Sequence, residues 1–88
     1  MCAPPPVLMN WDEIISVSAA VQRTGKSEAT IRRYCRRYGI ARQSCPNAPL
    51  EISLIGLEMV LHGDIAALDH LRDGRRDVPE VKRYLPDR

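Results

Sequence analysis

The residues of this sequence best suited to binding chemistry are arginines near its middle. Four of them fall within residues 32–37, namely Arg32, Arg33, Arg36 and Arg37. The guanidinium group is permanently charged, and its planar donors match both a phosphate and the edge of a guanine base. Four like charges within two helical turns repel one another unless an anion meets them. The pattern therefore indicates binding to a polyanion.

The distribution of charge along the chain favours the same kind of partner. The formal net charge is only +2, but residues 23–42 hold seven basic side chains and one acidic one. The other residues hold six basic and ten acidic side chains, so a segment near +6 adjoins a remainder near −4. This asymmetry is typical of a nucleic-acid-binding face. The alternative, an ordinary solvated surface, accounts less well for it.

The candidate DNA contacts extend beyond these four arginines. Arg32 and Arg33 are expected near the bases, while Arg36 and Arg37 are expected at phosphates. Base contacts usually come from the N-terminal end of a recognition helix, which adds the residues that begin it. These further candidates are Lys26, Ser27, Glu28 and Thr30.

The roles of the residues at this helix start are not equivalent. Ser27 is favoured as a helix cap over a base-reading residue, because its hydroxyl can accept from an unpaired backbone N–H. Glu28 either accepts a hydrogen bond from cytosine N4 or only interacts favourably with the positive N-terminal end of the helix dipole. Lys26 is expected to contact phosphate.

Catalytic and metal chemistry is not indicated. His62 and His70 are eight residues apart, and no third ligand stands at a metal-binding spacing. The sequence has no nucleophile–base pair, glycine-rich phosphate loop or paired carboxylates in an apolar setting. We therefore expect no enzymatic activity, metal, cofactor or small-molecule substrate.

Cysteine content and hydropathy bear on the cellular compartment. The sequence has three cysteines, an odd number, and no C-x-x-C motif, so neither a disulfide framework nor a zinc knuckle is expected. They are Cys2, Cys35 and Cys45. Reduced thiols fit a cytoplasmic protein, with Cys35 as a small buried hydrophobe. The sequence has no apolar run of membrane-spanning length, and its first residues do not match a signal peptide.

A helix–turn–helix is the expected frame for the arginines. A strand is expected over residues 12–17, followed by a helix to about residue 23. Ser16 or Ser18 caps this helix, and Gly25 ends it. The next helix, over residues 28–38, carries the arginines opposite an apolar face. That face consists of Ile31, Tyr34, Cys35 and Tyr38.

A β-hairpin is expected after the arginine helix. Residues 40–43 and 50–53 form its strands, and the turn-rich segment 44–49 (SCPNAP) forms its loop. Arg42 and Gln43 are then expected to reach the neighbouring minor groove or the DNA backbone. A hairpin in this place is the wing of a winged helix-turn-helix.

Two further helices are expected to complete the core. The first follows Ser53, and its predicted inward residues are Leu54, Leu57, Val60 and Leu61. The second follows Asp64, and its predicted inward residues are Ile65, Leu68 and Leu71. Residues 79–84 are compatible with a short helix or with disorder.

The expected fold class is therefore mainly α with a small β-hairpin wing, that is, an α+β winged helix-turn-helix. Residues 1–10 are expected to be a flexible N-terminal segment, and residues 11–74 the DNA-binding domain. Residues 75–88 are expected to be a charged C-terminal tail available for interactions.

The stretch VSAAVQRTGKSEATIRRYCRRYGIARQ, residues 17–43, resembles the MerR-like winged helix-turn-helix. It is most similar to excisionases, the recombination directionality factors of phages and integrative elements. The run S-x-x-T-I-R-R-Y, from Ser27 to Tyr34, carries the resemblance, which extends over about residues 13–62. The hairpin loop lacks the glycine-rich tip of many such wings.

The resemblance implies an architectural function. An excisionase binds and bends attachment-site DNA, often as several copies head-to-tail, and promotes excision of an integrative element by a separate enzyme. The implied partners are double-stranded DNA, a site-specific recombinase (integrase) and other copies of the chain. The implied location is the cytoplasm of a bacterium, with no membrane contact.

Two other functions stay open at this stage. A MerR-like transcriptional regulator shares the fold but carries a long dimerisation helix, for which the residues after the wing leave no room. A phage DNA-packaging or assembly adaptor would use its last helices to bind protein. A neighbouring integrase gene would favour the excisionase.

Overall fold

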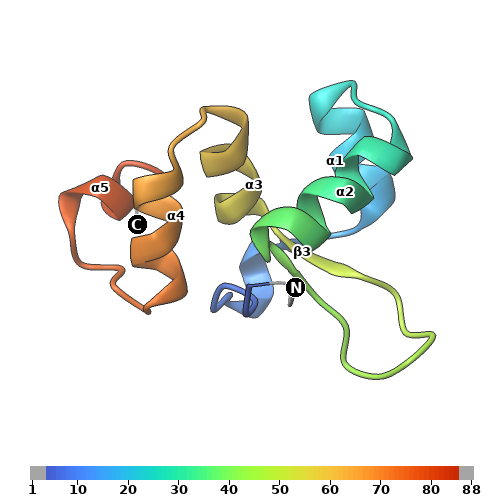
Figure 1. Ribbon diagram of the computed structural model, residues 1–88, viewed down its shortest axis with the longest axis horizontal. Helices are drawn as coiled ribbons and strands as arrows, with labels where there is room; N and C mark the ends of the chain where they lie inside the picture. Colours follow the sequence, from blue (N-terminus) through green and yellow to red (C-terminus); the bar gives the residue numbers. More distant parts are fainter. Residues whose placement is uncertain (1–3, 86–88) are drawn as a thin grey trace.

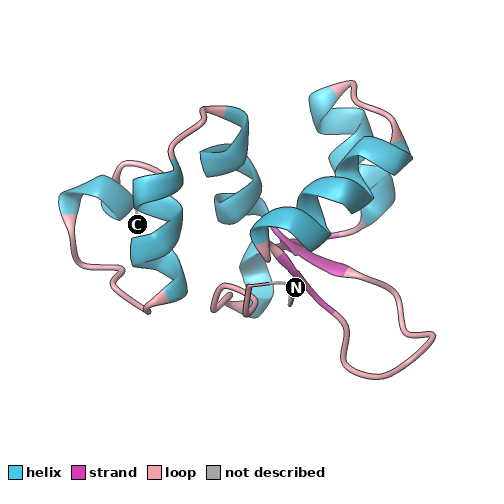
Figure 2. Cartoon of the chain, viewed as in Figure 1, coloured by secondary structure: helices cyan, strands magenta, loops and turns pink. Residues whose placement is uncertain are grey.

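Short helices separated by turns make up about half of the molecule, and three short strands form a small sheet (Figures 1 and 2). The computed structural model describes residues 4–85, so Cys2 and the outermost residues of both terminal segments lie outside it. The elements in chain order are η1 (Trp11–Glu13), β1 (Ile14–Ile15), α1 (Val17–Thr24), α2 (Glu28–Tyr38), β2 (Ala41–Arg42), β3 (Glu51–Ser53), α3 (Leu54–Leu61), α4 (Ile65–Arg72) and α5 (Pro79–Lys82). The fold is therefore of the α+β class, as the sequence predicts.

Local capping sets the ends of α1 and α2. Ser16, rather than Ser18, caps α1: its Oγ accepts from a backbone N–H three residues on, at 3.0 Å. Ser27 caps α2 in the same way, at 3.2 Å. Gly25 and Gly39 end the two helices with φ of 72° and 65°, a left-handed conformation that costs glycine little. The predicted bounds of the arginine helix are confirmed.

The sheet is antiparallel, with β3 between β1 and β2. The predicted hairpin is present: Arg42 lies opposite Glu51, and Ala41 lies opposite Ile52. On the other edge of β3, Ile15 also lies opposite Ile52, a pairing that the sequence does not predict. The base of the hairpin is thus anchored in the core through the fully buried Ile52.

The strand predicted over residues 12–17 is wrong at both ends. Its first residues belong to η1, where the Glu13 N–H donates to the Asn10 carbonyl at 2.9 Å. The Asn10 N–H donates in return to the Glu13 carboxylate at 3.4 Å, so a reciprocal cap turns the chain here. At the other end Ser16 already caps α1, so Val17 is helical and only two residues pair as β1.

Aliphatic side chains build the core, in keeping with the absence of phenylalanine from the sequence. The largest fully buried hydrophobic side chains are Ile31, Ile40, Ile52, Leu57, Met59, Leu68, Leu71 and Val81. Each such side chain contributes roughly 1.5–3 kcal/mol by leaving water. No helix among residues 4–85 is long and apolar enough to cross a membrane.

The inward face predicted for α3 is only partly correct. Of the predicted residues only Leu57 is fully buried, Leu61 is 38% exposed and the other two are half-buried. Ile55 and Met59 are buried instead. The reason is that α3 packs against both β3 and α4, so it buries two sides rather than one stripe.

The last two helices pack on each other, and α4 also packs on α3. In α4 Leu68 and Leu71 are buried as predicted, whereas Ile65 is 41% exposed. The short helix within residues 79–84 is present, and α5 packs against α4. The Tyr84 hydroxyl donates to Oδ2 of Asp64, the residue that caps α4, at 2.8 Å. The last turn is therefore tied to the body of the fold.

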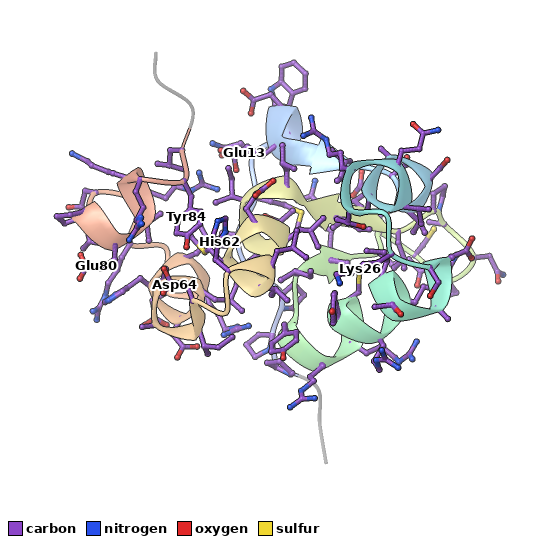
Figure 3. All side chains as sticks on the ribbon, turned by 90° about the horizontal axis from the view of Figure 1, so that it is seen from above. Glu13, Lys26, His62, Asp64, Glu80 and Tyr84 are labelled. Carbon is purple, nitrogen blue, oxygen red and sulfur yellow. The ribbon has the colours of Figure 1, made fainter. Side chains whose placement is uncertain are left out.

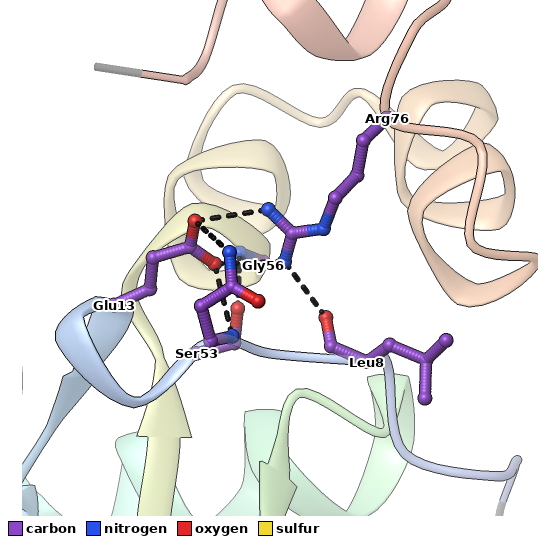
Figure 4. Close-up of polar contacts among 6 residues, drawn as sticks. Leu8, Glu13, Ser53, Gly56 and Arg76 are labelled. Atoms are coloured by element: carbon purple, nitrogen blue, oxygen red, sulfur yellow. Dashed lines mark hydrogen bonds and ion pairs between the residues drawn. The ribbon is translucent and has the colours of Figure 1, made fainter. Parts of the chain in front are cut away.

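Residues 5–13 are tied by hydrogen bonds to later parts of the chain. Val7 is buried, and its N–H donates to the Gly39 carbonyl at 2.9 Å. Arg76 donates to both oxygens of the Glu13 carboxylate, at 2.9 and 2.8 Å, and to the Leu8 carbonyl at 3.1 Å (Figure 4). Hydrogen bonding to Arg76 lowers the pKa of Glu13, against the opposing effect of burial.

Candidate nucleic-acid interface

The α2 helix has one buried and one charged face. Ile31 is fully buried and Cys35 is 8% exposed, while the half-buried Tyr34 and Tyr38 pack against the core. On the remaining surface of the helix the four predicted arginines are exposed: Arg32, Arg33, Arg36 and Arg37. The separation follows from 3.6 residues per turn. The helix therefore presents a row of guanidinium groups to solvent.

The hairpin divides these arginines into two groups. Arg32 and Arg36 line a hollow between α2 and the hairpin, whereas Arg33 and Arg37 do not. The guanidinium carbon of Arg37 lies 5.4 Å from the centroid of the Tyr38 ring, within the range of a cation–π contact. The charged face of α2 is thus wider than the hollow.

The start of α2 is an ordered, hydrogen-bonded end. The Ser27 hydroxyl accepts from the Thr30 N–H and donates to the Thr30 Oγ1 at 3.0 Å, so the favoured cap is present. The Glu28 carboxylate accepts from Nε of Arg32 at 2.9 Å. Lys26 precedes the cap and is half-buried. Four of the predicted contact residues are therefore held in two bonded pairs, Ser27 with Thr30 and Glu28 with Arg32.

Both predicted residues of the hairpin also have partners. Arg42 on β2 donates through Nε to Glu51 on β3 at 2.9 Å. The Gln43 side-chain amide donates to the Ala48 carbonyl across the loop. Figure 2 shows the loop projecting from the strands away from the helical body. The loop is long, but its base is held by these two contacts.

The hollow between α2 and the hairpin has a volume of about 310 Å³. It is lined by Pro6, Arg32, Cys35, Arg36, Ala41, Arg42, Gln43 and Leu50. Four predicted DNA-binding residues from two elements are thus brought together. The other six predicted residues do not line it: Lys26, Ser27, Glu28, Thr30, Arg33 and Arg37.

Cys35 contributes an unreactive thiol to this hollow. Burial raises the pKa of Cys35, while the nearby charges of Arg32 and Arg36 act in the opposite direction. A thiol with a raised pKa is a poor nucleophile at neutral pH. Cys35 therefore serves the hollow as part of its apolar wall.

Several contributors to this site are not among the predicted contact residues. Pro6 and Leu50 add apolar surface to the hollow, and Glu51 holds Arg42. Alternation along the returning strand was a signal that Glu51 faces outward. Its partner depends on the hairpin register, which a loop of this length leaves open.

The opposite side of the molecule has a different character. A hollow of about 460 Å³ there is lined by Asp12, Glu13, Leu54, Ile55, Glu58, His62, Arg83 and Tyr84. Figure 3 shows Glu13 and η1 at the edge of the molecule opposite α2. Three acidic residues thus stand apart from the arginine face. Within residues 4–85 no three His, Cys, Asp or Glu side chains are grouped to hold a metal ion.

Comparison of the chain with protein-family models, with curated proteins and with solved structures gives no match. Function must then be inferred from the chemistry of the site, because a fold alone does not specify an activity. The feature with the clearest chemistry is the arginine face of α2 and the hollow beside it.

Proposed function

We propose that this chain is a non-enzymatic protein that binds double-stranded DNA as a winged helix-turn-helix. In this proposal α2 enters the major groove and the β2–β3 hairpin is the wing. The α1 helix packs against α2 and contacts the DNA backbone. The observation that carries the proposal is the row of four exposed arginines on the side of α2 opposite its buried face.

The physical case begins with the shape and charge of the helix. The major groove of B-DNA admits one α-helix, and every groove is bordered by phosphates. An exposed helix with four arginines satisfies both conditions: some guanidiniums meet base edges and the others meet phosphates. The acidic residues of η1 lie at the opposite edge of the molecule, so they do not repel DNA docked on α2.

The ends of α2 favour a fixed docking geometry. Arg32 is held by Glu28 near the N-terminal end, where recognition helices usually contact bases. Ser27 and Thr30 are bonded to each other, so the helix start is ordered before DNA arrives. Base contact is therefore assigned to the first turn of α2, and phosphate contact to Lys26, Arg33, Arg36 and Arg37.

We extend the proposal to an excisionase role on the basis of sequence resemblance. The run from Ser27 to Tyr34, which carries that resemblance, coincides with the cap and first two turns of α2. In this role several copies assemble on attachment-site DNA and bend it. A separate integrase then carries out the recombination chemistry, and this chain supplies no catalytic group.

The test is a titration of the full chain against a random duplex and a candidate attachment-site duplex at two salt concentrations. Each phosphate contact is expected to contribute about −0.9 to the slope of log K against log salt. The double variant Arg33→Gln/Arg37→Gln is expected to lower that slope by roughly 2 and to weaken binding to both duplexes. The matched control is the single variant Arg75→Gln, compared with the single variant Arg33→Gln. Both remove one positive charge from an exposed side chain, but Arg75 lies outside the proposed interface.

The outcomes separate the two levels of the proposal. Absence of binding to either duplex at low salt would refute DNA binding altogether. Stepwise band shifts on one attachment-site fragment support assembly of several copies. A single two-fold-symmetric footprint would contradict that assembly and favour a dimeric regulator.

A further inference from the structure

We infer that the hollow between α2 and the hairpin is the seat of one backbone phosphodiester of the bound DNA. This assignment rests on the proposed function and names the contact that sets the position of the protein along the duplex. It is carried by three arginines, two carboxylates and an apolar wall that the fold gathers around one hollow.

The hollow has the composition of a phosphate site. Arg32 and Arg36 reach it from α2, and Arg42 reaches it from β2, so charge converges on it from two elements. Cys35 and Leu50 add apolar surface to its wall. Hydrogen bonds from a guanidinium to a phosphate are charge-assisted and stronger than neutral ones.

Two carboxylates orient two of these arginines. Glu28 accepts from Nε of Arg32 at 2.9 Å, and Glu51 accepts from Nε of Arg42 at 2.9 Å. No hydrogen bond from the described residues engages the terminal nitrogens of either guanidinium, so these donors are available to an anion. Ion pairs this exposed add little stability. We therefore assign Glu28 and Glu51 as positioning residues rather than as stabilising ones.

The net charge of the group selects a diester. Three arginines and two carboxylates leave one positive charge around the hollow. A phosphodiester carries one negative charge, whereas a terminal phosphate carries about −1.5 to −2 at neutral pH. One internal phosphate of a DNA strand therefore neutralises the group.

The experiment replaces each backbone phosphate of the bound duplex in turn by a neutral methylphosphonate. One position is expected to weaken binding of the wild-type chain by about tenfold, the usual effect of losing a charged hydrogen-bond pair. The variants Arg36→Gln and Arg42→Gln are expected to lose that position-specific penalty. The matched control Arg33→Gln, which removes the same charge outside the hollow, is expected to keep it.

The positioning residues have their own signature. Glu51→Gln removes a negative charge, so electrostatics alone predicts equal or tighter overall binding. If Glu51 orients Arg42, the variant should instead lose less affinity when the one sensitive phosphate is replaced by a methylphosphonate. Overall affinity that is maintained while this penalty falls supports positioning, and a penalty that stays unchanged contradicts it.

A second arm distinguishes a DNA phosphate from a free ion. Inorganic phosphate is titrated into the free chain while the Nε–Hε resonances of Arg32, Arg36 and Arg42 are followed by NMR. Shifts of these resonances by duplex, with no saturable shift by inorganic phosphate, support the diester. Saturable binding of inorganic phosphate, together with equal penalties along the duplex, would assign the hollow to a free anion and overturn the inference.

Failure of the inference is separable from failure of the proposed function. Tight duplex binding with equal methylphosphonate penalties at every position would overturn the phosphate seat alone. Absence of duplex binding by the wild-type chain would overturn both. The arginine variants change exposed side chains and Glu51→Gln a half-buried one, and circular dichroism of each checks that the fold is kept.

Discussion

The α2 helix and the α4–α5 region both carry several arginines, but their surroundings differ. On α2, Arg33 and Arg36 are exposed and have no acidic partner among the described residues. After α4, Arg76 is bonded to the buried Glu13 and to a backbone carbonyl. Arginine side chains are thus exposed and available for binding in one region, and bonded within the fold in the other. What decides its role is whether an acceptor from elsewhere in the fold reaches it.

Arg72 shows how the two regions depend on each other. Its guanidinium donates to the carbonyl of Tyr38, the last residue of α2, and to the Pro5 carbonyl at 3.0 Å. A cation at this place also interacts favourably with the negative end of the α2 dipole. The internal arginines therefore help to hold the helix that presents the external ones.

Arg76→Met is expected to have the largest effect on stability. It leaves the Glu13 carboxylate, which is only 5% exposed, without its cation. Removing one partner of such a pair costs about 3 kcal/mol, toward the low end of the range because Arg76 is partly exposed. Urea denaturation measures this loss.

The matched change on α2 is Arg33→Met, which should alter stability by less than about 0.5 kcal/mol. Its effect is expected on DNA affinity instead. Equal destabilisation by the two changes would break the distinction between internal and external arginines.

Gly39→Ala is expected to be the next largest effect, because Gly39 lies where the two regions meet. A Cβ at this position would stand 2.8 Å from the Pro5 carbonyl oxygen, at a φ of 65°. Left-handed strain alone costs about 1–2 kcal/mol, and the contact adds to it. Gly25→Ala, at a φ of 72° with nothing within 4 Å of the added Cβ, reports the strain alone. Thermal denaturation of both variants should rank Gly39→Ala as the less stable.

Ser27→Ala tests whether Ser27 only caps α2 or also reads a base. Loss of this cap is expected to lower the free energy of unfolding by about 1 kcal/mol. If Ser27 is a cap only, the sequence preference of DNA binding stays the same while stability falls. A changed base preference in binding to single-base variants of the site would make Ser27 a base-reading residue.

The pH dependence of stability is expected to show the smallest effect. The pKa of Glu13 is lowered in the folded state, so its contribution is present above the unfolded pKa and is lost as pH falls through the folded value. The stability difference between the wild-type chain and Glu13→Gln should therefore shrink as pH falls below the ordinary pKa of a glutamate side chain. A difference that is constant down to pH 3, measured by urea denaturation, would contradict this account.

Much of the arginine region follows from the sequence. The cap at Ser27, the stop at Gly39 and the opposition of arginines to Ile31 depend on neighbours within one or two turns. The strand over residues 12–17 failed because a polar turn at Asn10 and a cap at Ser16 compete with β-branched residues for the same segment.

The C-terminal half follows less well from the sequence. The side chains of α3 are apolar nearly all round, so periodicity cannot say that Met59 is buried and Leu61 is exposed. Burial of Val7 and Val81 depends on packing between segments far apart in the chain. Neither has a local signature.

The sequence by itself determined that one helix carries four arginines opposite an apolar face, because helical periodicity is a local property. Only the tertiary structure decided which arginines stay open to an anion. Arg76 meets Glu13 across 63 residues of chain, and Arg42 meets Glu51 through the hairpin register. Hydrogen bonds act over a few ångströms, so the partner of each guanidinium depends on how distant segments pack.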